Sequence, residues 1–144
     1  MPNFNTTRRL SDVRGTYAIL MVTRNRKPWM VGKLADDLQH SLTRHLTEQF
    51  DGIRLDELRI HPDHLHMVIT IKGDVKKSAK GFAYTARMGA AAELMERHGE
   101  ELKAAGVSLN LGLFARDMLV RTIGDGITDD EESTFLEAHE PSRK

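Results

Sequence analysis

Cysteine is absent from this 144-residue sequence, which excludes a disulfide framework, a zinc site built on thiolates and a thiol nucleophile. Long apolar runs are absent as well, and none approaches the roughly 18 residues that a membrane-spanning helix requires. The first residues are polar and lack the apolar core of a signal peptide. We therefore expect a cytoplasmic protein without a membrane partner, whose chemistry depends on side chains other than cysteine.

Net charge is also missing, because 21 Lys and Arg residues balance 21 Asp and Glu residues. A neutral sum argues against nucleic acid as a partner, but the charge is distributed unevenly. Residues 1–33 hold seven basic residues and one acid, whereas residues 125–140 hold seven acids and no Lys or Arg. A chain polarised in this way can still present a basic surface to phosphate groups.

The pattern of apolar residues predicts the fold class. The length suits one domain, and we expect a polar arm over residues 1–14 and a single domain over residues 15–144. Strand-like segments cover residues 16–23, 53–60, 64–72 and 118–123, and helical segments cover residues 34–50, 75–97 and 129–139. This β-α-β-β-α-β order with a terminal helix predicts an α+β, ferredoxin-like split βαβ fold, in which two helices cover one face of an antiparallel sheet.

His64 and His66 stand two residues apart at the head of the third predicted strand. Side chains alternate across a strand, so both imidazoles share one face, with their Cα atoms about 6.5–7 Å apart. Two imidazoles at that separation can ligate one divalent ion. The other face of the strand carries the apolar set, so we expect the histidines to point away from the core; that set is Leu65, Met67, Ile69 and Ile71.

The histidine motif and the segments around it resemble a known family. The motif follows Pro62-Asp63, the first strand is followed by Arg24-Asn25-Arg26-Lys27, and similar segments occur at residues 75–81 and 113–124. Together they resemble the HUH-type single-tyrosine transposases of bacterial and archaeal insertion sequences, including the REP-associated tyrosine transposases. The resemblance implies a homodimer that cuts and rejoins single-stranded DNA with hairpin ends through a 5′-phosphotyrosine. It also implies a divalent metal ion, Mg²⁺ or Mn²⁺.

In that family the terminal helix carries the nucleophilic tyrosine, and a polar residue four positions later completes the metal site. The tyrosine position falls on Phe135 here, and the later position falls on His139, so the resemblance implies His64, His66 and His139 as metal ligands. Phenylalanine has no hydroxyl and cannot attack a phosphorus atom. The chain is therefore an engineered Tyr→Phe form, a natural non-cleaving relative, or an enzyme whose nucleophile is one of its two tyrosines, Tyr17 or Tyr84.

Basic residues supply candidate contacts to the DNA backbone, which would make binding fall steeply with salt. These candidates are Arg24, Arg26, Lys76, Lys77, Lys80, Arg116 and Arg121. Three functions remain open at this point. The chain is a transposase disabled by Phe135, a non-catalytic relative that binds hairpin-ended single strands, or a ferredoxin-like domain with a structural metal and no nucleic-acid role.

Overall fold

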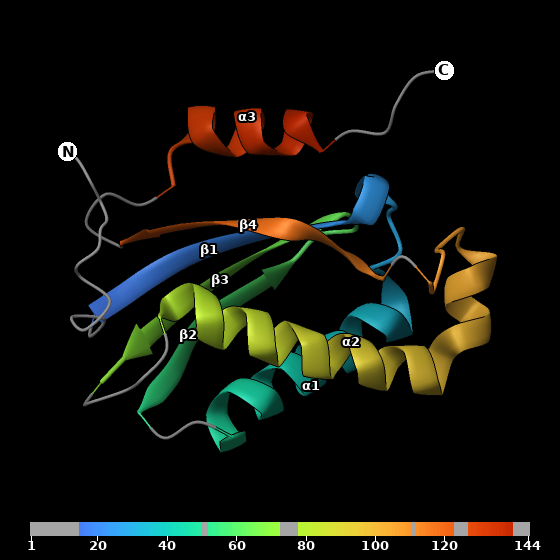
Figure 1. Ribbon diagram of the computed structural model, residues 1–144, viewed down its shortest axis with the longest axis horizontal. Coiled ribbons are helices and arrows are strands. Elements are labelled where there is room, and N and C mark those ends of the chain that lie inside the picture. The colour runs from blue at the N-terminus through green and yellow to red at the C-terminus, as the bar shows by residue number, and fades with distance from the viewer. Residues whose placement is uncertain (1–14, 50–51, 73–77, 111, 123–126, 140–144) are drawn as a thin grey trace.

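The computed structural model describes residues 15–49, 52–72, 78–110, 112–122 and 127–139. The arm expected over residues 1–14 lies outside the described residues, as do Lys76 and Lys77. Figure 1 shows the arrangement of the elements, which follow the order β1 (Gly15–Thr23), η2 (Arg24–Arg26), α1 (Gly32–Gln49), β2 (Ile53–Ile60), β3 (His64–Ile71), α2 (Ala79–Ala104), β4 (Phe114–Thr122) and α3 (Asp129–Ala138).

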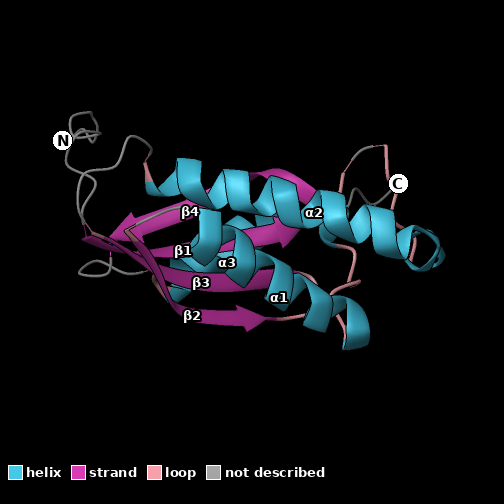
Figure 2. Ribbon diagram, turned by 90° about the horizontal axis from the view of Figure 1, so that it is seen from below, coloured by secondary structure: helices cyan, strands magenta, loops and turns pink. Residues whose placement is uncertain are grey.

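The four strands form one antiparallel sheet in the order β2-β3-β1-β4. Strands β2 and β3 form a hairpin. Helix α1 connects β1 to β2 and helix α2 connects β3 to β4, and in neither case are the two strands neighbours in the sheet. Helices α1 and α2 cover one face of the sheet, and α3 lies over the other (Figures 1 and 2). The predicted α+β split βαβ fold is therefore confirmed.

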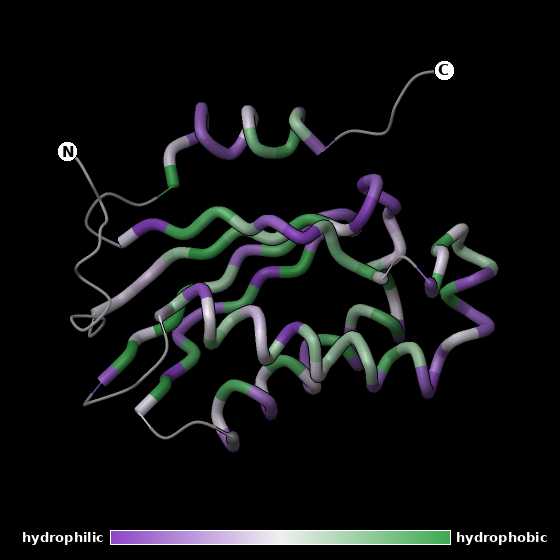
Figure 3. The backbone as a smooth tube through the Cα atoms, viewed as in Figure 1, coloured by the Kyte–Doolittle hydropathy of each residue, from purple (hydrophilic) through white to green (hydrophobic). Residues whose placement is uncertain are grey.

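The hydrophobic core lies between the sheet and the pair α1 and α2. On β3, burial alternates residue by residue along the strand, and the buried set Leu65, Met67, Ile69 and Ile71 is at most 1 % exposed. Leucines on α1 meet this face, and Leu38, Leu42 and Leu46 are fully buried. Burying one such side chain stabilises the fold by about 1.5–3 kcal/mol. Figure 3 shows the same alternation as hydrophobic and hydrophilic segments along the strands.

Helix α2 is longer than the sequence pattern predicts, because it continues past residue 97 to Ala104. The helix is distorted at His98, where φ is −129° and ψ is 29°. His98 is nonetheless buried. Its Nε2 forms a hydrogen bond with Oδ2 of Asp37 on α1 at 2.6 Å, and its Nδ1 forms one with Glu101 of its own helix. These hydrogen bonds hold the chain in the helix beyond His98, although Gly99 would suggest that the helix ends there. No helix among the described residues is long and apolar enough to cross a membrane.

A cluster of polar side chains, formed by Ser41, Arg44 and His45 of α1 and Glu93 of α2, joins the two helices. Glu93 of α2 accepts hydrogen bonds from Ser41 at 2.6 Å, from Arg44, and from His45 at 3.1 Å. The hydrogen bond from Arg44, followed by the one from Ser41, lowers the pKa of Glu93 from 4.5 to about 2. One turn before Glu93, Gly89 faces the His45 ring so closely that an added Cβ would lie 2.5 Å from its Cε1 atom. The two helices therefore approach each other where α2 has no side chain.

Candidate metal centre

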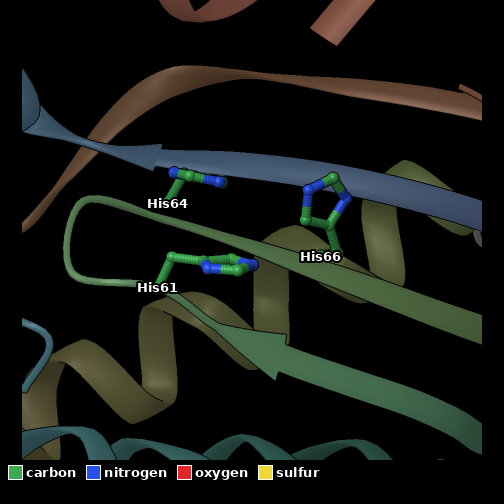
Figure 4. Close-up of side chains that lie close together, drawn as sticks. All are labelled: His61, His64 and His66. Atoms are coloured by element: carbon green, nitrogen blue, oxygen red, sulfur yellow. The ribbon is translucent and has the colours of Figure 1, made fainter. Parts of the chain in front are cut away.

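Three histidines converge at the turn between β2 and β3. Pro62 and Asp63 form the turn, and the backbone N–H of His61 donates to the carbonyl of His64 at 2.8 Å. Figure 4 shows the rings of His61, His64 and His66 pointing into a common space. The ring centroids of His61 and His64 lie 4.5 Å apart, and those of His64 and His66 lie 5.6 Å apart.

The position of the two strand histidines follows from the alternation of β3. His64 pairs with Val22 and His66 pairs with Leu20 on β1, so their side chains stand on the face of the sheet that α3 covers. Their side chains are only 15 % and 14 % exposed. The predicted outward orientation, away from the core of α1 and α2, is the one that the fold produces.

The three imidazoles fit a divalent ion. One ring nitrogen from each of His61, His64 and His66 lies within 4.8 Å of the other two, and imidazole nitrogen binds Zn²⁺ and Ni²⁺ more tightly than Mn²⁺. Burial lowers the pKa of His66 more than the nearby Glu132 carboxylate raises it. The neutral ring, which is the form that ligates metals, is thereby favoured at this position.

Asp63 and Arg26 hold the ring of His64 in place. Oδ1 of Asp63 accepts a hydrogen bond from Nδ1 of His64 at 2.8 Å, so Nε2 of that ring remains available to a ligand. Burial would raise the pKa of Asp63, but the hydrogen bonds from His64 and Arg26 outweigh it and lower the pKa. Arg26 donates to Oδ2 of Asp63 from Nε at 3.0 Å and from Nη2 at 2.7 Å. It also donates to the carbonyl of Leu136 at 3.1 Å, which ties α3 to the turn.

Glu132 of α3 faces the histidines, a contact that sequence reasoning missed. Its Oε2 lies 3.1 Å from Nε2 of His66 and 3.8 Å from Nε2 of His64. Together they line a cleft of about 570 Å³ that also includes His61 and Asp129. The sequence shows Glu132 only as one of four acids in the first turn of α3, where any acid favours the helix dipole. The contact of Glu132 with the histidines depends on how α3 lies on the sheet.

Phe135 and His139 do not lie in this histidine cleft. Phe135 lines a separate groove with Leu119 and Arg121 of β4. Nδ1 of His139 donates to the carbonyl of Phe135 at 2.8 Å, and the two rings lie 4.5 Å apart. The i, i+4 pairing is thus present, but among the described residues the histidine that joins His64 and His66 is His61. His139 follows Glu132 by seven residues, which corresponds to about 10 Å along a helix.

Neither tyrosine shares the face of the histidines. Tyr17 stands on the same face of β1 as Ile19 and Met21 and packs against the core on that side of the sheet. Tyr84 belongs to α2, on the same side of the sheet, and is 42 % exposed. The sheet therefore separates both hydroxyl groups from the cleft of His64 and His66.

Four of the predicted basic residues divide into two groups. Arg26 and Arg121 lie on the face of α3, where Nε of Arg121 donates to Glu131 at 2.9 Å. Arg24 and Arg116 instead line a pocket between η2, α2 and β4. Lys80 is exposed in the first turn of α2 and lines neither the histidine cleft nor the pocket of Arg24 and Arg116. Arg87 of α2, which the sequence also groups with Lys80 as a possible DNA-backbone contact, is instead buried and lines the pocket of Arg24 and Arg116.

Comparisons with known proteins agree with this fold. Residues 12–125 match the family model described as "Transposase IS200 like". This match contains all four strands and the three histidines, whereas α3, Phe135 and His139 lie beyond it. No curated protein matches.

Two solved structures share the fold. One is a protein of Deinococcus radiodurans R1 described as a transposase, with a TM-score of 0.69 and 15% identity, covering 99% of this chain and 98% of that chain. The other is a REP-associated tyrosine transposase bound to a REP hairpin, with a TM-score of 0.55 and 12% identity, covering 94% of this chain and 70% of that chain. Since the family model covers more than half of the sequence, the chain belongs to the IS200-like transposase family.

Proposed function

We propose that this protein binds single-stranded DNA with hairpin ends in the cytoplasm, as a metal-binding homodimer that lacks the tyrosine needed to cut the strand. Membership of the IS200-like family supports the DNA partner. A REP-associated tyrosine transposase of similar fold is bound to a REP hairpin, which supports hairpin-ended DNA. The homodimer rests on the resemblance to HUH-type transposases.

The observation that carries this proposal is the lack of a tyrosine hydroxyl on the histidine face. A 5′-phosphotyrosine forms when the phenolic oxygen bonds to phosphorus and a 3′-hydroxyl leaves. Phe135 has no oxygen to form that bond. Tyr17 and Tyr84 lie on the opposite side of the sheet. The chain can therefore hold a strand at the cleft, but its own tyrosines do not supply the attacking group.

The residues of the cleft would hold the ion in this account. We propose His64 and His66 as ligands and His61 as the third, because its ring nitrogen lies beside theirs. His139, which the resemblance implies as a ligand, would require a shift of α3 or the α3 helix of a partner. A bound Mg²⁺ or Mn²⁺ ion would polarise a phosphate oxygen of the strand. Asp63 keeps the His64 ring oriented, and Arg26 and Arg121 place positive charge on the same face.

A second candidate function is strand cleavage by a tyrosine-bearing form of the same chain. The position of Phe135 favours it, because Phe135 follows Glu132 by three residues and Glu132 contacts His66. Side chains three residues apart on a helix are neighbours, with Cβ atoms about 5–6 Å apart. A tyrosine at position 135 would therefore stand next to the residue that reaches the histidine cleft.

Binding can be tested with a pooled library of fluorescent DNA hairpins carrying single-stranded flanks. Fluorescence anisotropy would compare the unaltered chain, the H64A/H66A double variant and H40A, in Mn²⁺ or in EDTA. His40 is an exposed histidine of α1 on the other side of the sheet, so H40A is a matched control. We expect salt-dependent binding that weakens in EDTA and in H64A/H66A but not in H40A. Metal binding without any DNA binding would instead support a structural metal and contradict the proposal.

A further inference from the structure

We propose that the pocket of Arg24, Arg87 and Arg116 is a second site, on the other side of the sheet from the histidines, which binds one phosphate group of a bound DNA strand. The pocket has a volume of about 270 Å³ and lies where η2, α2 and β4 meet. Among the described residues its lining contains three arginines and no acid. The DNA source of the phosphate rests on the proposed function, whereas the affinity of the pocket for phosphate does not.

Arg87 is the central residue of this pocket, because it is a buried cation that pairs with no carboxylate among the described residues. The residue is only 4 % exposed. Its Nη2 donates to the carbonyl of Arg116 at 3.1 Å. Nη1 is buried and has no hydrogen-bond partner among the described residues. Buried charges in proteins are normally paired, since an unpaired one is expensive to remove from water. An anion entering the pocket would supply the missing partner.

A second arginine of the pocket, Arg24, also has a buried nitrogen, Nε, without a hydrogen-bond partner among the described residues. Arg24 follows β1 directly, and its backbone N–H donates to the carbonyl of Leu113 at 3.0 Å, which fixes it beside the start of β4. Arg116 is exposed and stands at the mouth of the pocket. The nearby acid, Asp117, is exposed and only attracts Arg87 through space. Guanidinium groups in this arrangement match the geometry of phosphate oxygens.

The rim of the pocket suits the rest of a nucleotide. The guanidinium of Arg87 lies 5.4 Å from the ring centroid of Tyr84 and 5.5 Å from that of Phe114. These contacts hold Arg87 in one orientation. Tyr84 is 42 % exposed and Met88, one turn later, is 56 % exposed. An exposed aromatic ring beside a phosphate site is a surface on which an unpaired base can stack. The combination favours single-stranded DNA over a free anion.

The pocket can be tested first without DNA, with inorganic phosphate as the probe. Thermal unfolding would be followed in phosphate and in chloride at equal ionic strength, for the unaltered chain, R87Q, R24Q/R116Q and R97Q. The R24Q/R116Q variant keeps the buried Arg87 and so tests the pocket even if R87Q does not fold. Arg97 is an exposed arginine of the same helix and serves as the control. We expect phosphate to raise the Tm of the unaltered chain and R97Q, and to have no such effect on the pocket variants.

The second arm measures binding to the single-stranded hairpins. Losing one charged hydrogen-bonding site should weaken affinity about tenfold. It should also reduce the slope of log affinity against log salt by about 0.7 for each lost phosphate contact. We expect both changes in R24Q/R116Q and neither in R97Q.

The outcomes separate this inference from the proposed function. Phosphate that stabilises no better than chloride, with unchanged DNA binding in the pocket variants, would overturn the site. Metal-dependent DNA binding that is unchanged when the arginines are replaced would also overturn this phosphate site, but it would leave the proposed function intact. Stabilisation by phosphate through Arg87 in a chain that binds no DNA would overturn the proposed function and assign the pocket to free phosphate.

Discussion

Oε2 of Glu132 on α3 lies 3.1 Å from Nε2 of His66 on β3. The contact joins a helix beyond the family match to the histidines within it. It brings a carboxylate to a cleft in which three imidazoles already converge. Carboxylate oxygen is a preferred ligand of Mg²⁺ and Mn²⁺, so we expect Glu132 to add a carboxylate to the proposed metal site.

The first prediction concerns this carboxylate. We expect E132Q to weaken Mn²⁺ binding about tenfold or more, because an amide carries no charge to attract the ion. Isothermal titration of the apoprotein with Mn²⁺ measures the affinity. Glu137 is an exposed acid of the same helix, so E137Q is the control and should bind as the unaltered chain does. Equal affinity in E132Q and E137Q would show that Glu132 is only a hydrogen-bond acceptor.

The second prediction concerns the residue behind the metal ligand. Asp63 accepts from Nδ1 of His64 and is fixed by Arg26. Replacing it by asparagine removes the charge that orients the ring, and such changes typically reduce metal affinity about 10–100-fold. We expect D63N to lose Mn²⁺ affinity in that range, as measured by the same titration. D36N, at an exposed site on α1, should have no effect, and an unchanged affinity in D63N would disprove the role.

The third prediction concerns the close approach of α1 and α2. An added Cβ at Gly89 would lie 2.5 Å from the His45 ring, which is held by Glu93. Overpacking of this kind costs about 1–3 kcal/mol, and the better helix propensity of alanine offsets about 1 kcal/mol. We expect G89A to have a lower free energy of unfolding in urea. A Cβ at Gly99 would meet only ordinary contact at 3.6 Å, so G99A should be no less stable than the parent.

The fourth prediction concerns pH and Glu93. Its pKa falls from 4.5 in the unfolded chain to about 2 in the folded protein, chiefly through the hydrogen bond from Arg44. The charged form therefore stabilises the fold fully above about pH 4.5, and this contribution is lost as the pH falls through about 2. E93Q should have a lower Tm than the parent at pH 7, and the difference should vanish near pH 2. A difference that persists unchanged at pH 2 would assign the effect to packing.

The fold could be predicted from the sequence because its signals are local. Leucines at every fourth position mark α1, and alternation marks β3, so both the elements and the face of His64 and His66 follow from periodicity. The end of α2 could not be predicted, since its continuation through His98 depends on Asp37, far away in the chain. The order of elements predicted the split βαβ arrangement, whose strands the structure places in the order β2-β3-β1-β4.

The site could be predicted only in part. His64 and His66 carry a spacing that the strand converts directly into geometry. His61 joins them only because the turn at Pro62 and Asp63 folds it back. Glu132 carries no local signal, since it is one acid among several, and Arg87 reads in the sequence as one more charge at the start of α2, although the fold buries it. Their roles depend on tertiary contacts that no sequence period encodes.

The central claim is that this chain has a transposase site without its nucleophilic oxygen. The most direct test compares the unaltered chain with F135Y on labelled single-stranded hairpin DNA in Mn²⁺, on a denaturing gel. F135Y/H64A serves as the control for the metal site. We expect a covalent protein–DNA band from F135Y alone, since only that variant supplies a hydroxyl beside an intact cleft. A covalent band from the unaltered chain would contradict the account, because it would show that another residue attacks the strand.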